Sequence, residues 1–254
     1  MLFDLTHSLY MLISALITAG LLVLAYFFVE RQESKERILK FVAVLTVAVH
    51  FSSLWVNFFT TGEKQVQESM LLPIYPCNIC MWLLLITAYV KKREGVAYTV
   101  LAEFTFWAGV VCGSIGIILN ENYANTPSLL DYEIFKGLFS HSTMVFGALY
   151  LRVGGFVKMR VFNTLSVICG LLFFILDGVV INALYRYFEL GDCNCMYLQE
   201  NPFPALPWLS SPVMGMMAVI LVFTITCIYE QITLPAQERW YVKIDEYKSQ
   251  RISK

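Results

Sequence analysis

The sequence has little charge. Only 15% of its 254 residues are Asp, Glu, Lys or Arg, whereas soluble domains contain about 25%. It also lacks a P-loop, a GxGxxG that follows a strand, a zinc-site spacing of Cys and His, low-complexity tracts and a convincing internal repeat. We therefore predict no cofactor and no metal site. The formal net charge of −1 gives no indication of a nucleic-acid partner.

Long apolar runs are what the sequence has in abundance. Hydrophobic residues make up 58% of the chain, and a helix that crosses a bilayer needs roughly 20 mostly apolar residues. The pattern predicts an all-α, polytopic membrane protein with seven transmembrane helices. The predicted spans are Leu9–Val29, Ile38–Phe59, Leu72–Val90, Thr99–Leu119, Ile134–Leu151, Val161–Leu184 and Pro212–Ile232.

Lys and Arg alternate in number between the connections of these spans. From the first connection to the C-terminal tail, the counts are 4, 1, 3, 1, 3, 1 and 5. Because basic residues are enriched on the cytoplasmic side, we expect a cell-membrane protein with its N-terminus outside and its C-terminus cytoplasmic. The first segment has no basic n-region and no small-residue cleavage site, which favours a retained helix. The predicted domains are a transmembrane domain (1–234) and a short cytoplasmic tail (235–254).

Polar side chains inside spans are costly, and they are candidates for function. A rise of about 1.5 Å per residue assigns each one a depth in the membrane. Four predicted helices contribute polar or thiol groups to one layer near the outer surface, and only Glu103 and His7 stand apart. This layer comprises Cys77, Cys80, Asn57, His141, Asp177 and Asn182, with His50 nearer mid-membrane.

The stretch "IYPCNIC" (74–80) stands at the start of the third predicted helix. Proline favours the first helical position, which places Cys77 among the unpaired N–H groups at the positive end of the helix dipole. Such a site favours the thiolate. With His141 as base, Asp177 as its orienter, and Asn78 and free N–H groups to stabilise an oxyanion, the layer is suited to covalent acyl transfer.

Other interpretations stand beside this one. Buried cysteines are usually small apolar residues, which is the favoured interpretation of Cys112, Cys169 and Cys227. A structural role is favoured for His50. Gly109 and Gly113 form a GxxxG pattern that predicts a close helix–helix contact.

A redox function is the main alternative. Cys77 and Cys80 have the spacing of a redox pair at a helix N-terminus, and Cys193 and Cys195 form a second possible pair in an outer loop. This layout resembles that of membrane enzymes that generate disulfides and pass electrons to quinone. A transporter or substrate-binding membrane subunit ranks third, because no inverted repeat or pair of broken helices is present.

Three stretches resemble a known family. "LPIYPCNICMWLLL", "FSHSTMVFGALYL" and "INALYRYFELGDCNCMYLQENP" are similar to landmarks of the YwaF-type integral membrane proteins, a bacterial family related to eukaryotic transmembrane protein 164. The resemblance implies a lipid acyltransferase that forms an acyl-cysteine on Cys77 with help from His141. The sequence departs from the pattern at Asn78, where the eukaryotic relative has His, and at Asn194-Cys195, where an Asn-Tyr pair is usual.

The resulting hypothesis is a membrane lipid acyltransferase, or acyl hydrolase, that acts on the outer-leaflet side. Its expected partner is a phospholipid or another acyl-lipid, while the donor, the acceptor and the oligomeric state are not indicated. The candidate catalytic residues are Cys77, His141 and Asp177. The candidate substrate-binding residues are Asn78, His50, Asn57, Asn182 and Asn194.

Overall fold

The computed structural model describes residues 2–61, 72–125, 127–202 and 206–245, and within them the regular structure is helical. Each predicted segment overlaps one long helix, which confirms the all-α class. The long helices are α1 (Leu5–Phe28), α2 (Gln32–Thr61), α4 (Pro76–Tyr89), α5 (Gly95–Ile118), α7 (Tyr132–Val153), α8 (Thr164–Tyr187) and α9 (Ser211–Thr233). The short ones are α6 (Glu121–Asn125), η1 (Val161–Asn163), η2 (Cys195–Tyr197) and η3 (Ala236–Glu238).

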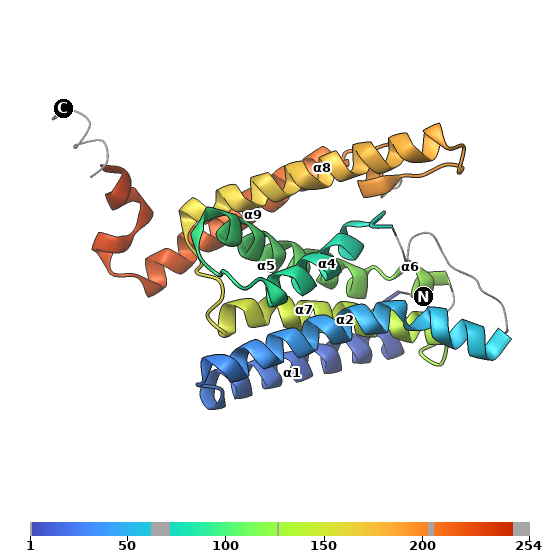
Figure 1. Ribbon diagram of the computed structural model, residues 1–254, viewed down its shortest axis with the longest axis horizontal. Coiled ribbons are helices and arrows are strands. Elements are labelled where there is room, and N and C mark those ends of the chain that lie inside the picture. The colour runs from blue at the N-terminus through green and yellow to red at the C-terminus, as the bar shows by residue number, and fades with distance from the viewer. Residues whose placement is uncertain (1, 62–71, 126, 203–205, 246–254) are drawn as a thin grey trace.

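The long helices lie roughly side by side and alternate in direction (Figure 1). The connections richest in Lys and Arg therefore gather at one end, here called the basic end, which comprises residues 29–31, 90–94, 154–160 and 234–245. The N-terminus lies at the other end, here called the opposite end. In this view α8 and α9 form an upper layer, α4 and α5 lie in the middle, and α1, α2 and α7 lie below.

Five of the described helical segments are long and apolar enough to cross a membrane, which confirms a multi-pass membrane protein. They correspond to α1, α2, α5, α8 and α9. With 14 residues, α4 extends only about 21 Å. Helix α7 has the length but carries Glu133, Lys136 and Arg152, and it packs against α1, α2, α4 and α5. Because protein surrounds α7, its polar groups need not face lipid.

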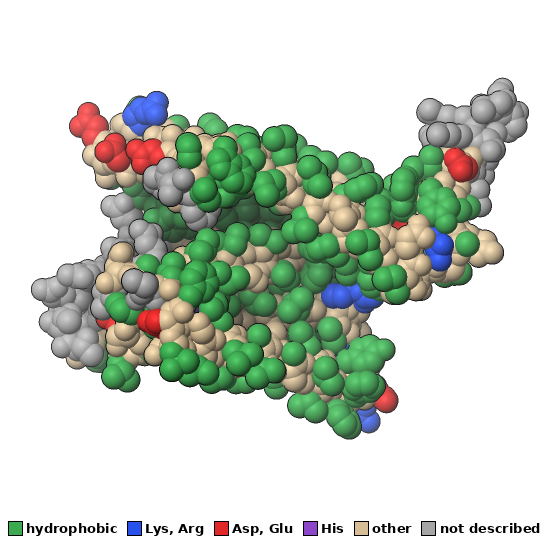
Figure 2. All heavy atoms as spheres, turned by 180° about the vertical axis from the view of Figure 1, so that it is seen from behind, with side chains coloured by type: hydrophobic (Ala, Val, Ile, Leu, Met, Phe, Trp, Pro, Cys, Tyr) green, Lys and Arg blue, Asp and Glu red, His purple; other side chains and the backbone are tan. Residues whose placement is uncertain are grey.

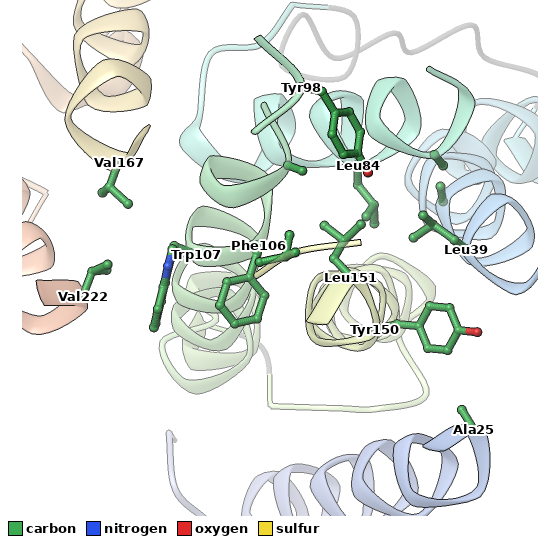
Figure 3. Packing of buried hydrophobic residues seen from close by; sticks show 14 residues of the cluster. Ala25, Leu39, Leu84, Tyr98, Phe106, Trp107, Tyr150, Leu151, Val167 and Val222 are labelled. Carbon is green, nitrogen blue, oxygen red and sulfur yellow. The ribbon is translucent and has the colours of Figure 1, made fainter. Parts of the chain in front are cut away.

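The core of the basic-end half draws on all seven long helices (Figure 3). Its centre is formed by α5 and α7, where Phe106 and Leu151 are buried. The outermost helices also reach it, through Ala25 of α1 and Val222 of α9. Every long helix is therefore held at this end by apolar packing.

The opposite half is organised differently. Its main apolar cluster comes from α4, α5, α7, α8 and the loop around η2, with no buried residue from α9. The buried residues of α9 are Val222, Thr226 and Glu230, all in its half toward the basic end. Figure 2 shows a recess between the α8–α9 layer and the rest of the molecule, with hydrophobic side chains around it.

Buried polar residues anchor both ends of the bundle. At the basic end, the Glu230 carboxylate accepts hydrogen bonds from the backbone N–H of Val161 (2.7 Å) and of Trp240 (3.0 Å), which ties the start of the tail to α9. Glu103 accepts one from Asn163 (2.8 Å). At the opposite end, His7 Nε2 donates to the Ile117 carbonyl (2.8 Å). Glu103 and His7, which stood apart from the predicted layer, thus have structural contacts.

Candidate functional site

Helix α4 begins at Pro76, as predicted, and Cys77 occupies its first turn. The thiol lies beside the backbone N–H groups of Cys77 and Asn78, and its S–H donates to Asn78 Oδ1 (3.4 Å). The free N–H groups expected here are partly used, because those of Asn78 and Ile79 both donate to the Tyr75 carbonyl. Tyr75 is the N-cap residue of α4. The N–H groups of Asn78 and Ile79 would have to leave its carbonyl before they could donate to an oxyanion.

Three thiols meet where α4 packs on α5. Cys80 is fully buried one turn below Cys77, and its thiol lies within hydrogen-bonding reach of Cys112. Cys77 also lies close to Cys112. Sequence reasoning treated Cys112 as an ordinary apolar residue. No sequence spacing links a residue of α5 to the Pro-Cys motif, so only helix packing reveals the group.

His141 points from α7 onto α5. Its Nδ1–H donates to the Gly137 carbonyl (2.7 Å), which leaves Nε2 as the acceptor of a neutral imidazole. The ring lies on Gly116, where a Cβ would be 2.2 Å from His141 Cδ2 and 2.4 Å from Nε2. Only glycine leaves room for the ring at this place.

The GxxxG pattern extends the same contact along α5. A Cβ at Gly109 would be 2.8 Å from Ala148 Cβ, and one at Gly113 would be 2.6 Å from Val145 Cγ2. The predicted close-packing face is therefore confirmed, with α7 as its partner.

The backbone of α5 brings the two main candidates near each other. Cys112 and Gly116 lie one turn apart on α5. The Cys77 thiol is beside the first and the His141 ring is against the second. No direct hydrogen bond between Cys77 and His141 is among the contacts of the described residues. Cys77 from α4 and His141 from α7 thus lie against adjacent turns of α5.

Asp177 contacts a different part of the molecule. The Cys195 thiol donates to its Oδ2 (3.6 Å), and burial together with this carboxylate raises the pKa of Cys195 to about 12. Asp177 therefore does not contact His141, contrary to the expectation. Helix α5 lies between α7 and α8 (Figure 1), and the Gly137 carbonyl orients the His141 ring instead.

Asn182 and Asn194 shape the loop that contains Cys195. Asn182 Oδ1 accepts from the backbone N–H of Cys195 (2.8 Å), and its amide donates to the carbonyl of the same residue (3.3 Å). Asn194 Oδ1 accepts from the N–H groups of Gln199 (3.0 Å) and Glu200 (3.1 Å). The loop is joined to the start of α4 where Met196 N–H donates to the Ile74 carbonyl (2.9 Å).

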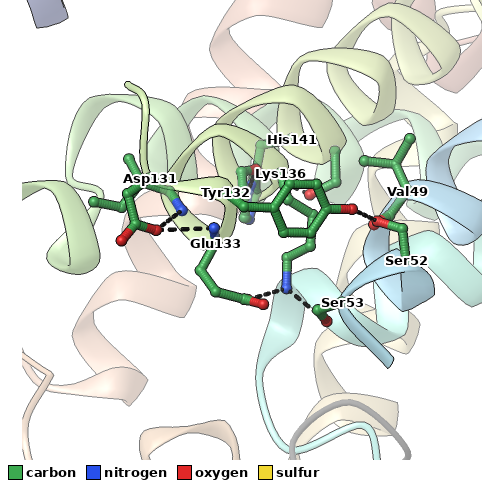
Figure 4. Close-up of polar contacts among 11 residues, drawn as sticks. Val49, Ser52, Ser53, Asp131, Tyr132, Glu133, Lys136 and His141 are labelled. Carbon is green, nitrogen blue, oxygen red and sulfur yellow. Dashed lines mark hydrogen bonds and ion pairs between the residues drawn. The ribbon is translucent and has the colours of Figure 1, made fainter. Parts of the chain in front are cut away.

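A polar cluster joins α2 to the first turns of α7 (Figure 4). Lys136 lies in α7, and its ammonium group is bonded to Glu133 (2.7 Å) and Ser53 (3.1 Å). His50 is near enough to Lys136 and His141 to interact electrostatically, and its buried Nε2 has no hydrogen-bond partner among the described residues. His50, a predicted substrate-binding residue, thus lies near His141.

Two other expectations concern Asn57 and metals. Asn57 belongs to α2, but its side chain lies outside the described part of the structure. In that described part, no group of three or more His, Cys, Asp or Glu side chains is arranged to hold a metal ion.

Comparison with known proteins identifies the family. The searches of curated proteins and of solved structures found no match. The family model of the TMEM164 family matches residues 2–229, a range that includes α4, α7 and the η2 loop. This supports the resemblance to transmembrane protein 164, while the bacterial YwaF name stays a prediction. The chain belongs to the TMEM164 family.

Proposed function

We propose that this protein is a cell-membrane lipid acyltransferase, or acyl hydrolase, with seven membrane-crossing helices. The basic end faces the cytoplasm and the opposite end faces outward. The alternating helix directions and the collection of Lys and Arg at one end support this orientation. α4 packs against α2, α5 and α7, and α7 packs against α1, α2, α4 and α5, so the polar groups of α7 are shielded from lipid by its neighbours.

One observation carries the chemistry. His141 is oriented by the Gly137 carbonyl so that Nε2 is the proton acceptor, and it lies one turn of α5 away from the neighbour of Cys77. This arrangement supplies a base beside a nucleophile at a helix N-terminus. The orienting acceptor is a main-chain carbonyl, so no carboxylate is required.

The proposed reaction has two stages. In the first, His141 takes the Cys77 proton, the sulfur attacks an ester carbonyl of a phospholipid, and the C–O bond breaks. The departing lysolipid alcohol takes the proton from His141, leaving a thioester. In the second, a hydroxyl, amine or water gives its proton to His141 and attacks the thioester, and the C–S bond breaks to regenerate the Cys77 thiol.

The shape of the opposite half suits a lipid substrate. Figure 2 shows hydrophobic side chains around a recess in this half, and the α9 side chains Met216, Ile220 and Leu221, in the half of α9 away from the basic end, are more than half exposed. A recess bordered by apolar side chains admits an acyl chain sideways from the outer leaflet. The η2 loop is held over the start of α4, and in this proposal that is the role of Asp177, Asn182 and Asn194.

Intact mass of the purified chain with native lipids tests this mechanism. We expect a fatty-acyl increment that hydroxylamine removes, that Cys77→Ser lacks and that His141→Ala reduces by at least a hundredfold. Cys80→Ser is the matched control and should keep the adduct. An adduct that persists in both Cys77→Ser and His141→Ala would contradict the proposal.

A redox function remains the second candidate, because five of the seven cysteines share the apolar cluster of the opposite half. In this redox reaction, the Cys77 and Cys80 thiols together transfer two electrons and two protons to a membrane quinone. The thiols form a disulfide and the quinone becomes a quinol. A mass deficit of two hydrogens that reductant restores and Cys80→Ser abolishes would favour this function. If neither adduct forms, a transport or binding role becomes the better hypothesis.

A further inference from the structure

A pocket of about 640 Å³ opens at the basic end, far from the site described above. It lies between the first turns of α2 and the connection from α4 to α5, where Figure 1 shows these ends together. Its charged lining comes from Lys40, Lys91, Lys92 and Arg93, with Glu36 and Glu94 as the acidic members. This set has four cationic and two anionic side chains and is therefore net positive.

The acidic groups do not neutralise the whole lining. Glu36 is engaged by Arg93 (2.6 Å) and by Lys40 (3.8 Å). Lys91 and Lys92 are exposed, and the ion pairs of the described residues include neither of them. With Glu94 included, the four cationic and two anionic side chains leave a net charge of +2, and Lys91 and Lys92 are the two exposed lysines of the lining.

Arg93 gives the pocket a rigid wall. Its guanidinium is held by Glu36, donates to the Ala88 carbonyl (3.0 Å) and stacks 5.0 Å from the centre of the Phe156 ring. Its Nε is buried and has no hydrogen-bond partner in the described part of the chain. A cation held in one place in the wall attracts a nearby anion.

The backbone at the start of α5 adds to the positive electrostatic potential of the pocket. Helix α5 has 24 residues and begins at this pocket, and its N-cap residue, Glu94, makes no side-chain capping bond. The first N–H groups of a helix and its dipole attract anions. Apolar surface is present here too: Tyr89 lines the pocket and is 53% exposed, and Val96, in the first turn of α5, is 81% exposed. An anion next to lipid-facing apolar surface is what a phospholipid presents.

We propose that this pocket binds the phosphate group of an anionic phospholipid in the membrane leaflet at the basic end. Lys91 and Lys92 contact the phosphate, Arg93 and the first turn of α5 orient it, and the acyl chains lie along Tyr89 and Val96. The site is independent of the proposed acyl transfer, because it lies at the other end of the bundle.

Native mass spectrometry of the full chain in detergent tests the site. Phosphatidylglycerol and phosphatidylcholine are titrated against the wild type, against Lys91→Gln/Lys92→Gln and against Lys158→Gln/Lys243→Gln. The last variant is the matched control, since it removes the same charge from exposed lysines at the same end that do not line the pocket. A parallel thermal-shift titration with inorganic phosphate at constant ionic strength separates lipid from soluble phosphate.

We expect phosphatidylglycerol to bind in preference to phosphatidylcholine, and the pocket variant to bind it about tenfold more weakly while the control does not. Protection by inorganic phosphate without a lipid preference would overturn the lipid as the source. Equal loss in both double variants would overturn the pocket, as would no preference between the lipids together with no phosphate effect.

Discussion

In the basic-end half of the bundle all seven long helices share one apolar core, whereas the main core of the opposite half includes no residue of α1 or α9. The inner stretch of α5, residues 102–109, is buried on every side, but farther along Ile115, Ile118 and Leu119 are exposed. Five of the seven cysteines, His141 and the recess belong to the looser half. One end thus holds all seven long helices together by apolar packing, and the other end is packed less completely.

The largest expected effect tests the packing difference. Leu151→Ala removes a fully buried side chain from the basic-end core and should lower the free energy of unfolding by about 2–5 kcal/mol. Ile220→Ala, at a position on α9 that is 65% exposed, should change it by less than about 0.5 kcal/mol. Unfolding by SDS in mixed micelles measures both. Equal losses would show that the two halves are packed alike.

The next effect is on chemistry in the looser half. Gly116→Ala places a methyl group where the His141 ring lies, so it should displace the ring and reduce acylation of Cys77 by about a hundredfold. Gly20→Ala, where no atom lies within 4 Å of the added Cβ, is the matched control. Timed intact-mass spectra give both rates. Acylation at the wild-type rate in Gly116→Ala would argue against His141 as the base.

A smaller effect concerns the η2 loop. With a pKa of about 12, the Cys195 thiol is almost entirely protonated at pH 8 and should react slowly with iodoacetamide. Asp177→Asn removes the carboxylate that disfavours the thiolate, so alkylation should become about tenfold faster. Peptide mass spectrometry locates the modified residue. A slower reaction in this variant would contradict the assigned cause.

The smallest effect concerns the contacts of Asp4 with His7 and Tyr123 near the N-terminus. The backbone N–H of His7 and the Tyr123 hydroxyl donate to the Asp4 carboxylate and hold its pKa below the usual value. Asp4 therefore adds stability above pH 3.8, and this stability is lost as the pH falls through its lower folded pKa. Tyr123→Phe should lower the melting temperature by a few degrees at pH 7, with a smaller difference near pH 3. A constant difference across this range would exclude the charged hydrogen bond.

The sequence by itself determined the all-helical class, the alternation of the helices and the start of α4, while the polar layer stays a prediction. Apolar runs, Pro76 at the start of α4 and the distribution of Lys and Arg act over a few neighbouring residues, so they are legible along the chain. They placed Cys77 at a helix start and predicted the close-packing face of α5.

Only the tertiary structure decided which side chains meet. Gly137 replaced Asp177 as the contact of His141, Asp177 paired with Cys195, and Cys112 joined Cys77 and Cys80. The physical reason is that depth along a helix follows from counting residues, whereas the neighbour across the interface depends on the rotation and order of packed helices. Those are set by contacts such as Gly109 with Ala148, which join residues distant in the chain.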